Sequence, residues 1–247
     1  MSPRCAGYHC LMDHLRNRIS SRYDVVIDSI PVEAEVFSVM RVRDTNVLLD
    51  RIDPASFAVD ERLPYWSELW SSSLELARYC ISGANVRGLK VLELGCGLGL
   101  AGIAAAYAGA EVTMTDYEED ALLFAAYNAM LNLPENVIGT RLSFVGLDWR
   151  RPPVMGRFDL VIGGDVVYDR SNFGPIRALL HAVLHPDGMA VLTDPGRGIG
   201  EDFFRAAAGE FTVDTYRTNV VLHGRRSVVT RNALRKRIMH DSRQEPA

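Results

Sequence analysis

The stretch "KVLELGCGLGLAGIAAAYAGAEVTMTD", residues 90–116, decides the fold of this chain. It begins with a short apolar run typical of a buried strand, turns through alternate glycines, continues as an alanine-rich helix and ends in a second strand. Parallel neighbouring strands need a crossover of a dozen or more residues between them, and this stretch supplies one. It therefore predicts an α/β domain.

The same alternation continues toward the C-terminus. Strands are predicted at 141–149, 158–168 and 189–194, and helices at 118–133, 173–184 and 200–210. The runs 211–222 and 225–234 are separated only by "HG", so they predict an antiparallel hairpin. We therefore predict an α/β fold with a doubly wound, mostly parallel seven-strand sheet that ends in a C-terminal antiparallel hairpin.

The N-terminal residues follow a different pattern. Residues 23–52 alternate apolar and polar side chains, which predicts short antiparallel strands with a turn at "RDTN", residues 43–46. We expect an N-terminal appendage over 1–60 and the main domain over 61–247. The main domain opens with a helix in the seventies, after a lead-in that carries Trp66 and Trp70.

Composition excludes several classes of function. The formal net charge of −4 gives no general basic surface for nucleic acid, and the arginines near the C-terminus are interpreted as a solvated strand pair and tail. No apolar run reaches the ~18 residues of a membrane span. Cys5 and Cys10, with His9 and His14, do not have the spacing of a zinc site. We expect a cytoplasmic protein, a monomer, with no metal, membrane or nucleic-acid partner.

The glycine-rich turn raises the question of its ligand. Gly97, Gly99 and Gly102 match G-x-G-x-x-G, which serves both dinucleotides and S-adenosyl-L-methionine, and Asp116 at the next strand end suits the ribose of either. Glu93 distinguishes them, because an acid beside Gly95 suits an amino group and a sulfonium and repels a pyrophosphate. We therefore predict S-adenosyl-L-methionine as the cofactor.

Further residues carry a resemblance to a known family. The stretch "VLELGCGLGLAGIAAAYAGAEVTMTDYEEDAL" resembles the class I, seven-strand S-adenosylmethionine-dependent methyltransferases. The motifs "PYW" at 64–66, "LDW" at 147–149 and "GGDVVYD" at 163–169 are similar to the lysine-methyltransferase-like group. "PYW" and "DPGR" at 194–197 resemble the branch that methylates the electron-transfer flavoprotein β subunit, although "SSS" follows Trp70 where that branch usually has a proline and glycines.

The resemblance, together with the strand-end positions, implies roles for individual residues. Asp165 and Tyr168 are the candidate catalytic pair, which would orient an acceptor amine. The candidate cofactor-binding residues are Trp70, Glu93, Gly95, Gly97, Gly99, Asp116, Asp148, Trp149 and Asp165, and the candidate substrate-binding residues are Trp66, Tyr168 and Arg197. Asp148 and Trp149 would hold the adenine ring.

Plainer interpretations stay open for some of these positions. Trp66 and Trp70 lie on a helical face and could pack in the core, and Asp194 with Arg197 could form a structural pair. At the level of function, the sequence predicts a protein-lysine N-methyltransferase. A small-molecule N-methyltransferase, a nicotinamide-dependent oxidoreductase or a noncatalytic S-adenosylmethionine-binding module are the alternatives, and Glu93 with the C-terminal hairpin disfavours the oxidoreductase.

Overall fold

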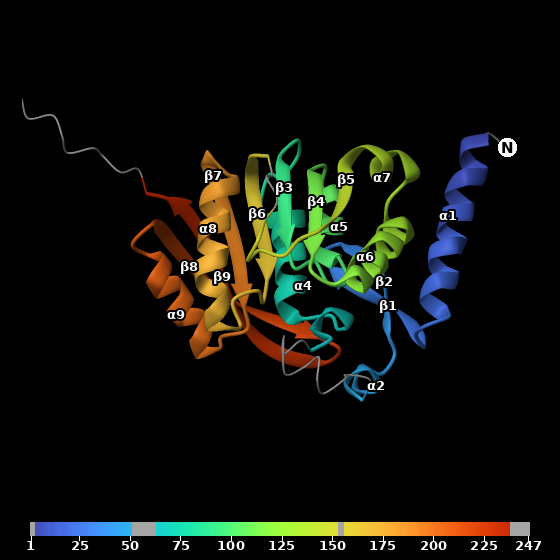
Figure 1. Ribbon diagram of the computed structural model, residues 1–247, viewed down its shortest axis with the longest axis horizontal. Helices are drawn as coiled ribbons and strands as arrows, with labels where there is room; N and C mark the ends of the chain where they lie inside the picture. The colour runs from blue at the N-terminus through green and yellow to red at the C-terminus, as the bar shows by residue number, and fades with distance from the viewer. Residues whose placement is uncertain (1–2, 51–62, 153–155, 238–247) are drawn as a thin grey trace, which may run out of the picture.

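A seven-stranded mixed sheet forms the centre of the computed structural model, which describes residues 3–50, 63–152 and 156–237 (Figure 1). Its strand order is β5-β4-β3-β6-β7-β9-β8. The strands are β3 (Lys90–Leu94), β4 (Glu111–Asp116), β5 (Leu142–Gly146), β6 (Phe158–Gly164), β7 (Leu184–Asp194), β8 (Phe211–Leu222) and β9 (Arg225–Lys236). The first five are parallel and the last two add an antiparallel hairpin. The predicted fold class is confirmed.

Helices cover both faces of this sheet, as buried parallel strands require. On β3, the Val91 side chain joins one hydrophobic cluster, whereas Leu92 and Leu94 join the other. The first cluster includes residues of α4 (Ser71–Arg78), α5 (Leu100–Tyr107) and α6 (Glu119–Asn132), and the second includes residues of α8 (Phe173–Val183) and α9 (Gly198–Ala207). A short helix that the sequence did not predict, α7 (Glu135–Arg141), precedes β5.

The N-terminal segment packs beside α6. It consists of α1 (Pro3–Ser20), the antiparallel pair β1 (Val25–Val32) and β2 (Glu35–Val42), and the short α2 (Asn46–Leu49). The Met40 amide donates to the Asn128 side chain at 2.7 Å, and the Asn128 side chain donates to the Met40 and Leu98 carbonyls at 3.1 and 2.9 Å. Asn128 thus joins β2 to the glycine-rich turn.

One predicted turn is wrong. The strands reverse at residues 33–34, where Glu33 has φ of 55°, and not at 43–46, where the chain leads into α2. A glutamate in the left-handed region has no sequence signature, whereas "RDTN" has turn-forming residues that here precede a helix.

Three short helical segments complete the described chain: η1 (Tyr65–Ser67), η2 (Tyr79–Gly83) and η3 (Arg170–Asn172). Among the described residues, no helix combines the length and apolar character needed to cross a membrane. The same residues contain no group of three or more His, Cys, Asp or Glu side chains arranged to hold a metal ion.

Candidate functional site

A cavity of about 750 Å³ opens at the carboxyl ends of β3, β4 and β6. This is the edge at which open α/β sheets bind ligands, because the strand order reverses there and leaves a crevice between the flanking loops. Residues from η1, the glycine-rich turn and the loops after β4, β5, β6 and β7 line it. Of the twelve different residues predicted for the site, all except Gly99 line this cavity.

The glycine-rich turn forms one wall. Gly95, Gly97 and Gly99 have φ of 60°, 51° and 85°, in the region that residues with a side chain rarely adopt. A Cβ on Gly97 would lie 3.3 Å from the Trp66 carbonyl oxygen, whereas one on Gly99 would lie 2.7 Å from the Met114 Cε. Gly97 therefore faces the cavity wall and Gly99 serves close packing against β4 and α6, which differs from its predicted cofactor contact.

Glu93 lies buried beneath this turn, with 4% of its surface exposed. Burial raises the pKa of its carboxyl to about 8, the Gly102 amide lowers it and the nearby Asp116 raises it further. Among the described residues its Oε2 has no hydrogen-bond partner. A carboxyl in this place can accept from N–H donors of a ligand, and a positively charged ligand would favour its ionised form.

This raised pKa predicts a pH-dependent stability. Between pH 4.5 and about 8 the Glu93 carboxyl is protonated in the folded state and ionised in the unfolded chain. Its contribution to the free energy of unfolding is therefore complete below pH 4.5 and is lost as the pH rises through about 8. Between pH 6.5 and 7.5 we expect the titration of Glu93 to lower the free energy of unfolding by about 1 kcal/mol. Urea unfolding of the ligand-free protein and Glu93→Gln at both values measures it, since the variant lacks this proton; an equal pH dependence in both proteins would contradict the assignment.

Asp116, at the end of β4, holds the glycine turn and the next loop together. Its Oδ2 accepts from the Gly97 amide and its Oδ1 from the Glu118 amide, both at 2.9 Å. Burial raises its pKa to about 6, against the lowering effect of these amides. Each carboxylate oxygen has a second lone pair, so Asp116 can still accept from a vicinal pair of hydroxyl groups, as on a ribose.

The loop after β5 supplies the opposite wall. Asp148 forms an ion pair with Arg150 at 2.8 Å, and this side-chain hydrogen bond lowers the pKa of the Asp148 carboxyl. Trp149 donates from its indole nitrogen to the Asn172 side chain at 3.1 Å, and its ring lies 3.6 Å from the position of a Cβ on Gly95. The hydrogen bond to Asn172 orients the indole beside the glycine turn, and the indole offers a flat surface on which an aromatic ligand can pack.

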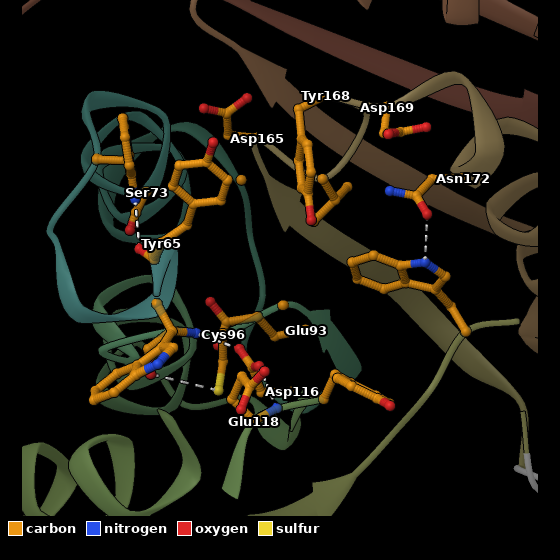
Figure 2. A pocket seen from close by; sticks show the side chains of 18 of the residues that line it. Tyr65, Ser73, Glu93, Cys96, Asp116, Glu118, Asp165, Tyr168, Asp169 and Asn172 are labelled. Atoms are coloured by element: carbon orange, nitrogen blue, oxygen red, sulfur yellow. Dashed lines mark hydrogen bonds between the residues drawn. The ribbon is translucent and has the colours of Figure 1, made fainter. Parts of the chain in front are cut away.

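The loops after β6 and β7 form the other end of the cavity. Figure 2 shows Asp165, Tyr168 and Tyr65 together there, with Glu93 and Asp116 at the opposite end. Asp165 has φ of 57°, and its amide donates to the Thr193 carbonyl at 2.8 Å. The Arg197 guanidinium donates to the Asp165 carboxylate at 2.9 Å. Burial raises the Asp165 pKa to about 6 although Arg197 opposes the shift.

Aromatic rings gather at the Asp165 end of the cavity. The Tyr65 ring lies edge-on to Tyr168 and Trp70, with centroid distances of 5.8 and 6.0 Å. The Trp70 indole donates to the Tyr65 carbonyl at 2.9 Å, and Arg197 lies 6.0 Å from the Trp70 ring centroid. Trp70 therefore belongs to this end, and Arg197 pairs with Asp165 and not through its side chain with Asp194.

Trp66 lines the cavity, but its ring also packs in the core. Its ring packs against Phe124 at 5.2 Å and Tyr23 at 5.9 Å, and its backbone faces Gly97. The plainer interpretation as a packing residue at the glycine turn fits these contacts.

Sequence reasoning missed several lining residues, namely Tyr65, Ser73, Tyr117, Glu118 and Asn172. A signal existed for Tyr117 and Glu118, because they directly follow the predicted strand-end acid Asp116. None existed for Asn172, since its contact with Trp149 joins two loops that are 23 positions apart.

Comparison with known proteins places this site in a family. The family model described as lysine methyltransferase matches residues 65–208, which is more than half of the chain. The chain belongs to the lysine methyltransferase family. The predicted family resemblance is thereby confirmed.

Two curated relatives match the same part of this lysine methyltransferase family member. EEF1A lysine methyltransferase 3 of Mus musculus is 35% identical over 149 residues, covering 58% of this chain and 62% of that protein. The electron transfer flavoprotein beta subunit lysine methyltransferase of Danio rerio is 34% identical, covering 56% of this chain and 53% of that protein. The match thus spans less than two thirds of either relative.

Solved structures show the same fold at low sequence identity. A putative RNA methyltransferase from Pyrococcus horikoshii superposes with a TM-score of 0.55 at 16% identity, over 78% of this chain and 98% of that one. At this identity the likeness concerns the fold alone, in agreement with the strand order of this family member.

Proposed function

We propose that this protein is an S-adenosyl-L-methionine-dependent protein-lysine N-methyltransferase. The observation that carries the proposal is the arrangement of one cavity: the glycine turn, Glu93 and Asp116 lie at one end, and Asp165 with Tyr168 lies at the other. Family membership supports the reaction class, and both curated relatives are named as lysine methyltransferases.

The residues present fit the cofactor. Gly95 and Gly97 hold the left-handed backbone of the turn that lines the cavity, the Glu93 carboxyl lies beside this turn where an amino group would need an acceptor, and Asp116 can accept from ribose hydroxyls. Trp149 would pack against the adenine ring with Asp148 beside it. When bound, the cofactor supplies an electrophilic methyl group on a sulfonium sulfur.

The chain's own residues then have to prepare the acceptor. A lysine side chain has a pKa of about 10.4 and must lose a proton before its nitrogen can attack. Water or a carboxylate would take up this proton, the Asp165 carboxylate held by Arg197 would accept a hydrogen bond from the nitrogen, and the Tyr168 hydroxyl would fix its direction. The surrounding Tyr65 and Trp70 rings would exclude water from the line of attack.

The charges of the cavity support a cationic acceptor. Among the described residues seven acidic side chains line it, of which all but the protonated Glu93 can carry negative charge at neutral pH: Glu68, Glu93, Asp116, Glu118, Asp148, Asp165 and Asp169. The cations that line it in the described part of the chain, Arg150 and Arg197, are both paired with lining carboxylates. A cavity of this kind attracts a lysine side chain and repels a carboxylate or phosphate substrate.

Incubation with methyl-labelled S-adenosylmethionine and host lysate tests the proposal. We expect a labelled protein band in which mass spectrometry finds the added mass on lysine. Label confined to the small-molecule fraction would replace the proposal with a small-molecule N-methyltransferase, and cofactor binding without any label would replace it with a noncatalytic binding module.

We also propose that the protein acts as a cytoplasmic monomer on a protein acceptor, without a nucleic-acid partner. The described cysteines Cys10, Cys80 and Cys96 are free thiols, which suits a reducing compartment. Light scattering and microscopy of a tagged protein check these two points.

A further inference from the structure

The projecting end of the β8–β9 hairpin has one buried face and one open face. Val220 and Val229 are fully buried in the same hydrophobic cluster as Leu74 of α4, so one face packs under that helix (Figure 1). On the opposite face, Val221 and Val228 are 49% and 52% exposed. Directly paired residues of antiparallel strands share a face, and the register pairs Val221 with Arg226, Asn219 with Val228, and Arg217 with Thr230.

This open face is basic. Arg217 and Arg226, which the register places on this face, are exposed, and no carboxylate of the described residues pairs with either of them. Other basic side chains of the hairpin do have acidic partners. Arg235 lies 3.6 Å from Asp214, and His223 lies 3.2 Å from Asp28. Two exposed valines between unpaired arginines make a surface that suits a partner with acidic and apolar side chains.

The same face adjoins the mouth of the cavity. Thr230 donates from its hydroxyl to the Asp194 carbonyl at 3.2 Å, and a Cβ on Gly196 would lie 3.9 Å from the Val228 carbonyl oxygen. The next residue along, Arg197, lines the cavity. The hairpin face and the cavity mouth are therefore consecutive parts of one surface, with opposite charge: basic on the hairpin and acidic in the cavity.

We propose that the hairpin face formed by Arg217, Asn219, Val221, Arg226 and Val228 docks the methyl-acceptor protein through an acidic and apolar segment near the target lysine. This inference rests on the proposed function for the identity of its partner. The target lysine enters the acidic cavity while the acidic residues beside it in the acceptor protein bind the basic hairpin. An acceptor that has both features is therefore favoured over one that has only one of them. Exposed valines favour a protein over a nucleic acid, because the described residues place no aromatic ring on this face for bases to stack on.

A binding assay that needs no methyl transfer tests the docking surface. The probe is a fluorescein-labelled peptide of Asp and Leu residues without lysine, and its counterpart has Asn in place of Asp. We expect Arg217→Glu with Arg226→Glu to weaken binding of the acidic peptide about tenfold or more. Arg16→Glu with Arg18→Glu, on exposed positions of α1, makes the same change in net charge and should leave the affinity within twofold.

Two further measurements separate the outcomes. Val221→Thr with Val228→Thr should weaken the acidic peptide about threefold, since it removes apolar contact and keeps the strand shape. Equal affinity of the wild type and the hairpin variants for the acidic peptide would overturn the proposal, and so would an equal loss of affinity in the α1 variant. Tighter binding of a single-stranded RNA oligonucleotide than of the peptide would also overturn it. The peptide result stands whether or not the lysate experiment shows lysine methylation, so the two proposals fail separately.

Once an acceptor is known, the hairpin variants also have a kinetic signature. We expect the Arg217→Glu, Arg226→Glu protein to raise KM for the intact acceptor protein and to leave kcat for a short lysine peptide unchanged. A loss of kcat on the short peptide would show that the hairpin acts on the cavity and not on docking.

Discussion

Asp165→Asn is expected to lower kcat for methyl transfer about 100- to 1000-fold. The substitution removes the negative charge that would accept the acceptor's N–H and keeps the size of the side chain. It also keeps the backbone, because Asn tolerates the left-handed conformation that residue 165 adopts with φ of 57°. The affinity for S-adenosylmethionine should change little, since Glu93 and Asp116 would bind the cofactor at the other end of the cavity.

Titration calorimetry with the cofactor and single-turnover kinetics measure the two effects separately. Asp187→Asn, an exposed position on β7, is the matched control and should behave as the wild type. Equal loss of binding and turnover in Asp165→Asn would assign the residue to the cofactor, and unchanged turnover would remove it from the mechanism. In the wild type the pKa of about 6 predicts that turnover falls as pH drops through 6, where Asp165 becomes protonated.

Asp116→Ala should raise the dissociation constant of the cofactor about 100-fold, through the loss of charge-assisted hydrogen bonds to a carboxylate. The change removes the expected ribose acceptor and frees the Gly97 and Glu118 amides at the same time. Asp116→Asn keeps one acceptor oxygen and should lose less. The same calorimetry checks both, with Asp214→Ala on the exposed side of β8 as control; a dissociation constant unchanged in Asp116→Ala would contradict the placement of the ribose.

Much of the fold was predictable because it depends on patterns that are local in sequence. The apolar runs of β3, β6 and β7, and the alternate glycines between β3 and α5, specify buried parallel strands and a tight crossover. Helix α7 was missed because "ENVIGTR" has no buried residue and hence no apolar periodicity.

The site was predictable where strand ends carry the chemistry, as at Glu93, Asp116 and Asp165. It was not predictable where the role depends on packing across the fold. Gly99 looks like its neighbours Gly95 and Gly97, yet what it contacts is set by Met114 and Ala125 on other elements. The contact of Tyr65 with Tyr168 depends on the tertiary fold, because the two residues lie in segments far apart in the sequence. In the folded protein the Tyr65 ring also contacts Trp70.

The amide of Asn128 gives the N-terminal segment a part in the behaviour of the cavity. One buried side chain bonds both to Met40 on β2 and to the Leu98 carbonyl of the glycine turn, and Leu98 lines the cavity. A ligand that stabilises the turn is therefore expected to stabilise the strand pair as well. By thermodynamic linkage, the strand pair then stabilises the turn by the same free energy. The predicted boundary near residue 60 lies outside the described residues, and Asn128 couples the strand pair before it to the glycine-rich turn after it.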